Sequence, residues 1–262
     1  MILLFIFLLL FFILYIYKKK WTPVHPIFYF SEEIFLFGHR GAPSLAPENT
    51  KESFVKAFEA GIKGVELDVQ LSKDKELIVF HDWDMKNITG SPKLIEDMDY
   101  SEIRTLSHEN NFHISLLKEI LDICPREKYI NIEIKSRHYL NKFLVEKIVE
   151  IIRLYELQKY VIVSSFNPFL LLFAKNILPD LSTAYLWSSE EPTFLFNSPL
   201  WIWICRPDGF HIDINDADEK NISWARKKKL AILAFTVNNL TDLSKARKLG
   251  LDGIFTDYPY LK

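Results

Sequence analysis

The sequence has few of the residues that mark disordered, disulfide-bonded or nucleotide-binding chains. Only 8 glycines, 12 prolines and 2 cysteines occur among its 262 residues, which excludes a collagen-like chain, a low-complexity chain and a disulfide framework. Neither Cys124 nor Cys205 belongs to a Cys-x-x-Cys pair, so zinc binding and thiol redox chemistry have no support. No glycine-rich nucleotide-binding loop is present. Because 32 basic residues nearly balance 34 acidic ones, we expect no nucleic-acid partner, and no protein partner is predicted.

The chain does contain one long apolar run, at its N-terminus. Residues 1–17 carry no charge and are followed by Lys18, Lys19 and Lys20. Seventeen helical residues would be about 25 Å long, the lower limit for crossing a bilayer. A cleaved signal peptide is the alternative, but the basic start and the small-residue cleavage site of such peptides are missing. We therefore expect a single-pass membrane anchor over residues 1–20, a juxtamembrane segment over 21–34, and the remaining domain on the cytoplasmic side.

From residue 35 onward, short aliphatic segments alternate with helical patterns, as in parallel strands joined by crossover helices. This alternation predicts an α/β fold, a (β/α)8 TIM barrel over residues 35–262, rather than an open doubly wound sheet, whose glycine-rich loop is absent. The long gap between the second and third strands predicts a small insertion over residues 71–114 that begins with a hairpin. The expected strands are 35–39, 65–69, 129–135, 161–165, 183–187, 209–213, 231–237 and 253–256. The expected helices are 50–60, 116–123, 140–155, 170–178, 219–229 and 241–249.

Acidic residues alternate with aliphatic residues on two of these strands. Glu66 and Asp68 share one face of the second strand, and Glu133 lies on the third. Because helices cover the outside of a parallel barrel, these carboxylates must point into it, although the same alternation also occurs in half-solvated strands. Three carboxylates crowded at the barrel mouth repel one another unless a cation neutralises them. The pattern predicts one divalent cation, Mg²⁺ or Ca²⁺, bound by all three.

Two histidines and two cationic residues are expected at the same mouth. His39 and Arg40 end the first strand, His81 follows the apolar run 77–80, and Lys135 ends the third strand. Imidazoles on opposite sides of a phosphoester can serve as base and acid. Arginine and lysine side chains bind phosphate oxygens. Together with a metal, these residues predict phosphodiester cleavage.

Seven short motifs occur in order between residues 35 and 260. They are Phe37-Gly38-His39-Arg40-Gly41-Ala42, Pro47-Glu48-Asn49-Thr50, Glu66-Leu67-Asp68-Val69, Val79-Phe80-His81-Asp82, Asn131-Ile132-Glu133-Ile134-Lys135, Ser164-Ser165-Phe166 and Gly253-Ile254-Phe255-Thr256-Asp257-Tyr258-Pro259. These motifs resemble those of the glycerophosphodiester phosphodiesterases. The resemblance implies a barrel with a small insertion after its second strand. It also implies metal-dependent hydrolysis of glycerophosphodiesters to sn-glycerol 3-phosphate and an alcohol.

The resemblance also implies roles for individual residues. It gives His39 and His81 as the acid/base pair, Glu66, Asp68 and Glu133 as metal ligands, Arg40 and Lys135 as phosphate contacts, and Glu48 as a neighbour of the bound glycerol or the metal. The family usually has tryptophan at the position of Phe235, so this chain keeps an aromatic wall there but loses an indole N–H donor. In related enzymes a hydroxyl of the substrate's own glycerol is thought to attack phosphorus. The residues of this sequence do not specify whether that hydroxyl or water is the nucleophile here.

Two alternative functions are considered. A lysophospholipase D would use the same chemistry on substrates that keep one acyl chain, and the N-terminal apolar run and the aromatic residues at 194–196 and 201–204 favour it. An inert barrel that binds head groups or a partner belongs to another class. We expect such a barrel to have lost a histidine or a carboxylate, whereas this sequence keeps all of them.

Overall fold

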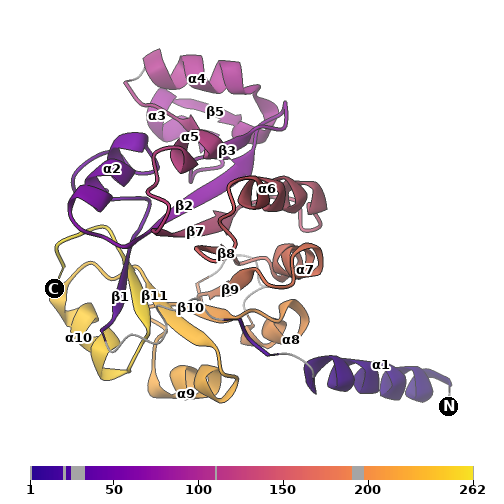
Figure 1. Cartoon of the computed structure of the whole chain (residues 1–262). Helices are drawn as coiled ribbons and strands as arrows, with labels where there is room; N and C mark the ends of the chain where they lie inside the picture. The colour runs from indigo at the N-terminus through magenta and orange to yellow at the C-terminus, as the bar shows by residue number, and fades with distance from the viewer. Residues whose placement is uncertain (1, 20–21, 25–32, 110, 191–197, 262) are drawn as a thin grey trace.

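Eight parallel strands form a closed barrel in the computed structural model, which describes residues 2–19, 22–24, 33–109, 111–190 and 198–261 (Figure 1). Among these residues, β1 pairs with both β12 and β2, which closes the ring. The strands are β1 (Phe35–Gly38), β2 (Gly64–Leu71), β7 (Tyr129–Ile134), β8 (Val161–Ser165), β9 (Ser182–Trp187), β10 (Gly209–Asp213), β11 (Ala231–Phe235) and β12 (Gly253–Thr256). The predicted TIM barrel is confirmed.

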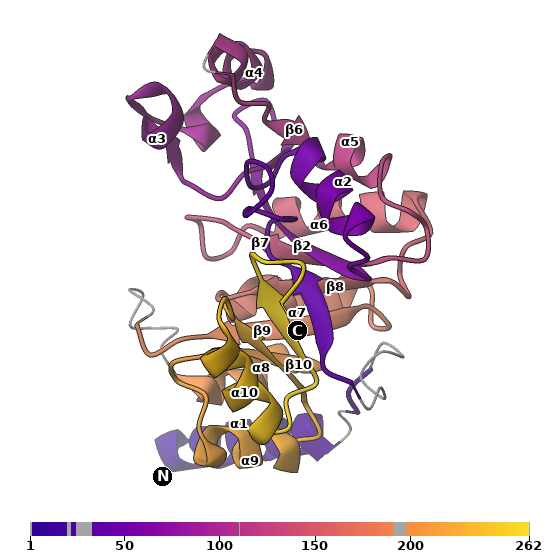
Figure 2. The same cartoon turned by 90° about the vertical axis from the view of Figure 1, so that its left-hand side faces the viewer.

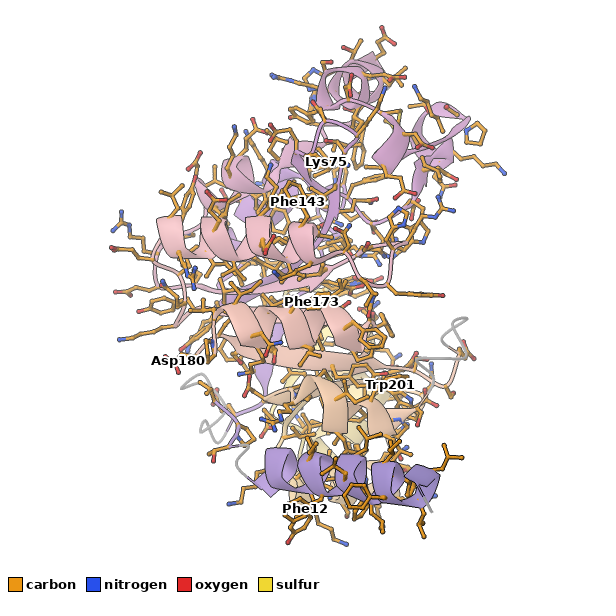
Figure 3. All side chains as sticks on the ribbon, turned by 90° about the vertical axis from the view of Figure 1, so that its right-hand side faces the viewer. Phe12, Lys75, Phe143, Phe173, Asp180 and Trp201 are labelled. Carbon is orange, nitrogen blue, oxygen red and sulfur yellow. The ribbon has the colours of Figure 1, made fainter. Side chains whose placement is uncertain are left out.

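Helices cover the outside of the barrel, and side-chain caps fix where most of them begin. Thr50, Asn141, Asn167, Asp218 and Asn239 each accept a hydrogen bond from a backbone N–H in the first helical turn, which satisfies a donor that has no partner within the helix. Figure 3 shows α6, α7 and α8 in a row along one flank. The helices are α2 (Lys51–Glu59), α5 (Leu117–Leu121), α6 (Lys142–Leu154), α7 (Pro168–Ile177), α8 (Ile202–Cys205), α9 (Glu219–Lys227) and α10 (Leu240–Lys248).

The alternation on β2 and β7 separates the interior of the barrel from its helical layer. The aliphatic residues of both strands belong to the large core that includes the buried faces of the outer helices. The acidic residues of β2 lie on the inner face, where Glu66 and Asp68 are only 3 % and 1 % exposed. Ordinary half-solvated strands do not bury carboxylates in this way, so the interpretation of inward-pointing acids holds.

Between β2 and β7 the chain builds a small subdomain, at the top of Figures 1 and 2. β3 (Leu77–Val79) pairs antiparallel with β2, forming the hairpin, and β6 (Ser115–Leu116) pairs with β3. The other elements are β4 (Asp84–Met85), α3 (Lys86–Thr89), β5 (Ser91–Leu94), η2 (Ile95–Asp97) and α4 (Tyr100–Glu109). A separate apolar cluster that includes Phe80, Met85 and Met98 stabilises this subdomain. The exact boundaries 71–114, and those of the segments 1–20 and 21–34, stay predictions.

The N-terminal helix α1 (Ile2–Lys19) requires a correction. Across the described ranges, no helix has the length together with the apolar character that crossing a membrane demands. α1 has 18 residues, of which the last two are lysines, so its apolar part is shorter than the roughly 30 Å hydrocarbon core of a bilayer. The expected transmembrane anchor is therefore wrong, and the structure does not support the membrane partner that was expected from it. The expected cytoplasmic location stays a prediction.

Candidate active site

Three carboxylates converge at the carboxyl ends of β2 and β7. Glu66, Asp68 and Glu133 each offer an oxygen, and these oxygens lie within 4.8 Å of one another. The two strands are neighbours, and Asp68 is paired directly with Glu133 in the sheet register. Period-two alternation places all three on the inner face, which is why local sequence pattern was enough to find them.

Burial and mutual repulsion give these acids unusual proton affinities. Burial, together with the negative charges of Asp68 and Glu133, raises the pKa of Glu66 well above its ordinary value. Burial alone would also raise the pKa of Asp68, but the positive charges of Lys135 and Arg40 outweigh it and lower that pKa to about 2. The site thus concentrates the negative charge of three carboxylates in a buried place, and the positive charges of Lys135 and Arg40 neutralise only part of it.

This group of residues fits a hard divalent cation. Glu66 Oε1 is buried and has no hydrogen-bond partner among the described residues, which is costly for a carboxylate oxygen unless a ligand satisfies it. The donors are all carboxylate oxygens, the ligands that Mg²⁺ and Ca²⁺ prefer. The predicted ligands Glu66, Asp68 and Glu133 could therefore hold the cation together, and the donor set does not distinguish Mg²⁺ from Ca²⁺.

The two predicted histidines each bind a carboxylate through Nδ1. His39 Nδ1 lies 2.7 Å from Asp257 Oδ1, and His81 Nδ1 lies 2.8 Å from Asp82 Oδ1. Burial alone would raise the pKa of each aspartate, but the hydrogen bond that the aspartate accepts from its histidine contributes to a pKa below the ordinary value. An ionised aspartate only accepts hydrogen bonds, so Nδ1 carries the hydrogen and Nε2 is left to exchange a proton with a substrate.

Arg40 lies in a tight turn between β1 and α2 and binds several acids. Its Nη1 donates to Glu48 Oε1 at 2.8 Å, its Nε is 3.3 Å from Asp68 Oδ2, and its backbone N–H donates to Glu66 Oε2 at 2.8 Å. Burial alone would lower the pKa of Arg40, but the negative charges of these acidic neighbours outweigh it and raise that pKa. The turn needs Gly41, which has φ +93° and where a Cβ would come within 2.4 Å of Ser53 Oγ.

A cavity of about 660 Å³ opens above these groups. Of the predicted residues, it is lined by His39, Arg40, Glu66, His81, Glu133, Lys135 and Phe235. Asp68 lies behind the lining, where Lys135 Nζ approaches it at 3.7 Å. Glu48 is not among the residues that line the cavity, but it accepts a hydrogen bond from the Arg40 guanidinium, which does line it. Its expected place beside the glycerol or the metal stays a prediction.

The wall of the cavity is aromatic. Trp83, Tyr139, Phe166 and Phe235 all line it, and the rings of Phe166 and Phe235 lie 5.9 Å apart, nearly perpendicular. The predicted aromatic wall at Phe235 therefore exists, with four further members from other elements, since Phe255 of β12 also lines the cavity.

Comparison with known proteins agrees with this architecture and these motifs. A sequence model of the Glycerophosphoryl diester phosphodiesterase family matches residues 39–261. The chain belongs to this family. A glycerophosphodiester phosphodiesterase from Bacillus altitudinis is 31 % identical over 235 residues, covering 86 % of this chain and 94 % of the relative. The family is one of enzymes, and the chain is a phosphodiesterase rather than an inert binding barrel.

Two solved structures extend the comparison. A glycerophosphodiester phosphodiesterase from Thermotoga maritima is 32 % identical, with a TM-score of 0.72, and the match covers 87 % of this chain and 96 % of that one. An Oleispira antarctica phosphodiesterase in complex with the product sn-glycerol-3-phosphate is 28 % identical, with a TM-score of 0.74, covering 86 % and 93 %. The glycerophosphoryl diester phosphodiesterase fold thus extends over nearly all of the barrel.

Sequence reasoning missed the residues that orient the two histidines of this family member. Asp257 is fixed by Asn238, whose Nδ2 donates to its Oδ2 at 2.6 Å, and Asp82 by Asn87, whose Nδ2 donates to its Oδ2 at 2.8 Å. Both aspartates stand inside the quoted motifs, directly after His81 in one case and after β12 in the other. Since β1 pairs with β12, the expected barrel order could have suggested the contact between His39 and Asp257.

Proposed function

We propose that the chain hydrolyses glycerophosphodiesters to sn-glycerol 3-phosphate and an alcohol, with a divalent cation and histidine acid/base catalysis. The observation that carries this proposal is the cluster of three carboxylates beside two histidines whose Nδ1 atoms are both bound to aspartates. The Oleispira antarctica relative in complex with sn-glycerol-3-phosphate supports the same product for this chain.

The residues divide the work as follows. Glu66, Asp68 and Glu133 would hold Mg²⁺ or Ca²⁺, which when bound supplies positive charge against the phosphate oxygens. Arg40 and Lys135 bind the same oxygens. The Arg40 and Lys135 side chains both line the cavity, so they can reach a phosphate bound above the three carboxylates.

The histidines move the protons. Burial lowers the pKa of His81, so its imidazole starts neutral, and its Nε2 takes the proton from the attacking hydroxyl as the new P–O bond forms. His39 Nε2 gives a proton to the alcohol oxygen as the old P–O bond breaks. Water as the nucleophile gives sn-glycerol 3-phosphate directly. A hydroxyl of the substrate's glycerol would instead give a cyclic phosphate, which water then opens, with His39 Nε2 taking the proton of that water and His81 Nε2 returning its proton to the departing glycerol oxygen.

Turnover of glycerophosphocholine by the purified chain tests this proposal. We expect a chelator to abolish release of sn-glycerol 3-phosphate, and Mg²⁺ or Ca²⁺ to restore it. Glu66→Ala should not recover with either ion, whereas Glu109→Ala, which removes an exposed acid of α4 from the subdomain, should behave as the parent does. Chelator-resistant turnover would refute metal dependence, and an active Glu66→Ala variant would refute the assignment of the site.

A lysophospholipase D activity is the second candidate, and one surface feature favours it. Tyr139 lines the cavity and is 47 % exposed, and it is followed by Leu140 and Phe143, which are 67 % and 47 % exposed. Figure 3 shows Phe143 on α6, on the outside of the barrel. An acyl chain leaving the cavity beside Tyr139 would cover this apolar strip. Parallel assays of glycerophosphocholine and lysophosphatidylcholine separate the two functions, since cleavage of the acylated substrate alone would reverse our order.

A further inference from the structure

Gln70 makes two hydrogen bonds that no proposed role yet explains. It lies on β2 two residues beyond Asp68, on the same inner face, and it is 4 % exposed. Its Nε2 donates to the backbone carbonyls of Phe80 at 2.9 Å and of Asp82 at 2.8 Å. A side-chain amide nitrogen carries two hydrogens, so both are used. The two accepting carbonyls belong to the residues on either side of His81.

The backbone at His81 depends on this amide because the sheet ends just before it. β3 ends at Val79, and the last backbone bond to β2 runs from Phe80 N to Asp68 O at 3.1 Å. Within the described ranges, the backbone hydrogen bonds include none made by His81 or Asp82. His39 differs, since its N–H donates to Thr256 O at 2.9 Å and so continues the barrel ladder.

We propose that Gln70 is a positioning residue that fixes the backbone on both sides of His81 to β2, the strand that carries Glu66 and Asp68. The inference rests on the proposed function of His81. One amide thereby sets the distance between the imidazole, which comes from the subdomain, and the acids, which come from the barrel. The alternative is a purely structural amide that stabilises the hairpin and affects catalysis only through folding.

A double-mutant cycle in kcat separates these two explanations. Gln70→Met keeps the length of the side chain and removes both donors. We expect its kcat to fall about 10²-fold, as displacement of a catalytic group by about 1 Å does, while KM changes less than about threefold. If Gln70 acts through His81, the same substitution in a His81→Ala background should cost less than about twofold, whereas in a His39→Ala background it should keep its full cost.

Two further variants control for folding. Ser72→Ala removes two partly buried hydrogen bonds from the same hairpin, one that Ser72 Oγ donates to Asp74 and one that it accepts from the Glu76 N–H. Since neither involves His81, this variant should have a lower melting temperature and an unchanged kcat. Gln70→Asn keeps the amide on a shorter side chain that reaches one carbonyl at most. Its kcat should lie between those of the parent and Gln70→Met. If Gln70→Met does not fold, Gln70→Asn replaces it in the cycle. Hydrogen exchange at the Phe80 amide, which donates to Asp68 O beside the first of these carbonyls, should be faster in both Gln70 variants.

Three outcomes would overturn the assignment. Parental kcat in the folded Gln70 variants would show that the amide is not needed, and an equal loss in the His81→Ala background would show that it acts elsewhere. An unaffected His81→Ala variant would refute the proposed function itself, and the role of Gln70 with it. The equal loss, in a cycle where His81→Ala by itself lowers kcat, would refute the role of Gln70 alone.

Discussion

The candidate site is assembled from two regions that hold the residues of the proposed mechanism in different ways. The barrel carries the three acids on β2 and β7 and His39 directly after β1, and the ladders of these strands continue around a closed ring. The subdomain between β2 and β7 carries His81 and Trp83 just beyond the end of a three-residue strand. Backbone pairing fixes the first group, whereas side-chain hydrogen bonds fix the second. The geometry at His81 should therefore be easier to disturb without unfolding the protein than the geometry at His39.

The strongest test of this comparison removes each histidine. We expect His39→Ala and His81→Ala each to lower kcat by about 10² to 10⁴-fold, the range for loss of a general acid or base. Melting temperatures should stay near that of the parent, since His39 is 19 % and His81 34 % exposed at the side chain. His113→Ala, an exposed histidine of the subdomain, is the matched control and should keep full activity. Parental kcat in either active-site variant would remove that histidine from the mechanism.

The aspartate partners give the next largest effect. Asp257→Asn and Asp82→Asn replace an acceptor with an amide that can turn its donor toward Nδ1, favouring the wrong tautomer. We expect each to lower kcat by about 10 to 10²-fold, typical of groups that orient a catalytic ligand. Asp257 is held twice by Asn238, through its side chain and through its own N–H, whereas Asp82 is held by the exposed Asn87.

The two dyads should therefore respond differently to loss of their outer support. Asn87→Ala should change kcat by less than Asn238→Ala does, and measurement of both pH profiles checks this order. The reverse order would mean that the single hydrogen bond from Asn87 supports its dyad more than the two hydrogen bonds from Asn238 support theirs.

Much of the part of the site that lies on the barrel could be predicted, because the residues of its strands alternate with a regular period. Two-residue alternation locates Glu66, Asp68 and Glu133, and the order of the strands brings them together. The hydrogen bonds that hold the backbone beside His81 could not be predicted in this way. They depend on the side-chain conformation of Gln70, which reaches across the hairpin to the carbonyls of Phe80 and Asp82. Glu48 illustrates the same limit, since its position in a motif did not indicate that it would bind Arg40. The N-terminal helix was misjudged because its uncharged run lies at the lower limit for crossing a bilayer, and the lysines that end α1 add nothing to its apolar length.

A buried histidine provides a probe of the barrel alone. His211 on β10 is fully buried, and burial lowers its pKa to about 3. Between that value and about 6.5 the unfolded chain binds a proton that the folded chain does not, so stability falls as pH decreases through this window. At pH 5 the cost relative to pH 7 is roughly 2 kcal/mol. We expect His211→Leu to lose that much less stability between pH 7 and pH 5 in denaturant titrations.

The control for this effect comes from the subdomain. His108→Leu replaces an exposed histidine of α4, and its stability should follow the pH dependence of the parent. Equal pH dependence in His211→Leu and the parent would mean that the imidazole on β10 is accessible to protons in the folded state.

The smallest expected effect concerns the contact that joins the two regions beside the cavity. Glu96 of η2 in the subdomain binds Arg137 at 2.9 Å and His138 at 3.2 Å, both in the loop after β7. Exposed pairs of this kind contribute about 0 to 1 kcal/mol, so Glu96→Gln should leave the melting temperature nearly unchanged. Because Arg137 lines the cavity, we expect KM to change by less than about fivefold and kcat to stay constant, most visibly at low salt. A large loss of kcat would instead show that this bridge, and not Gln70, sets the distance between His81 and the acids.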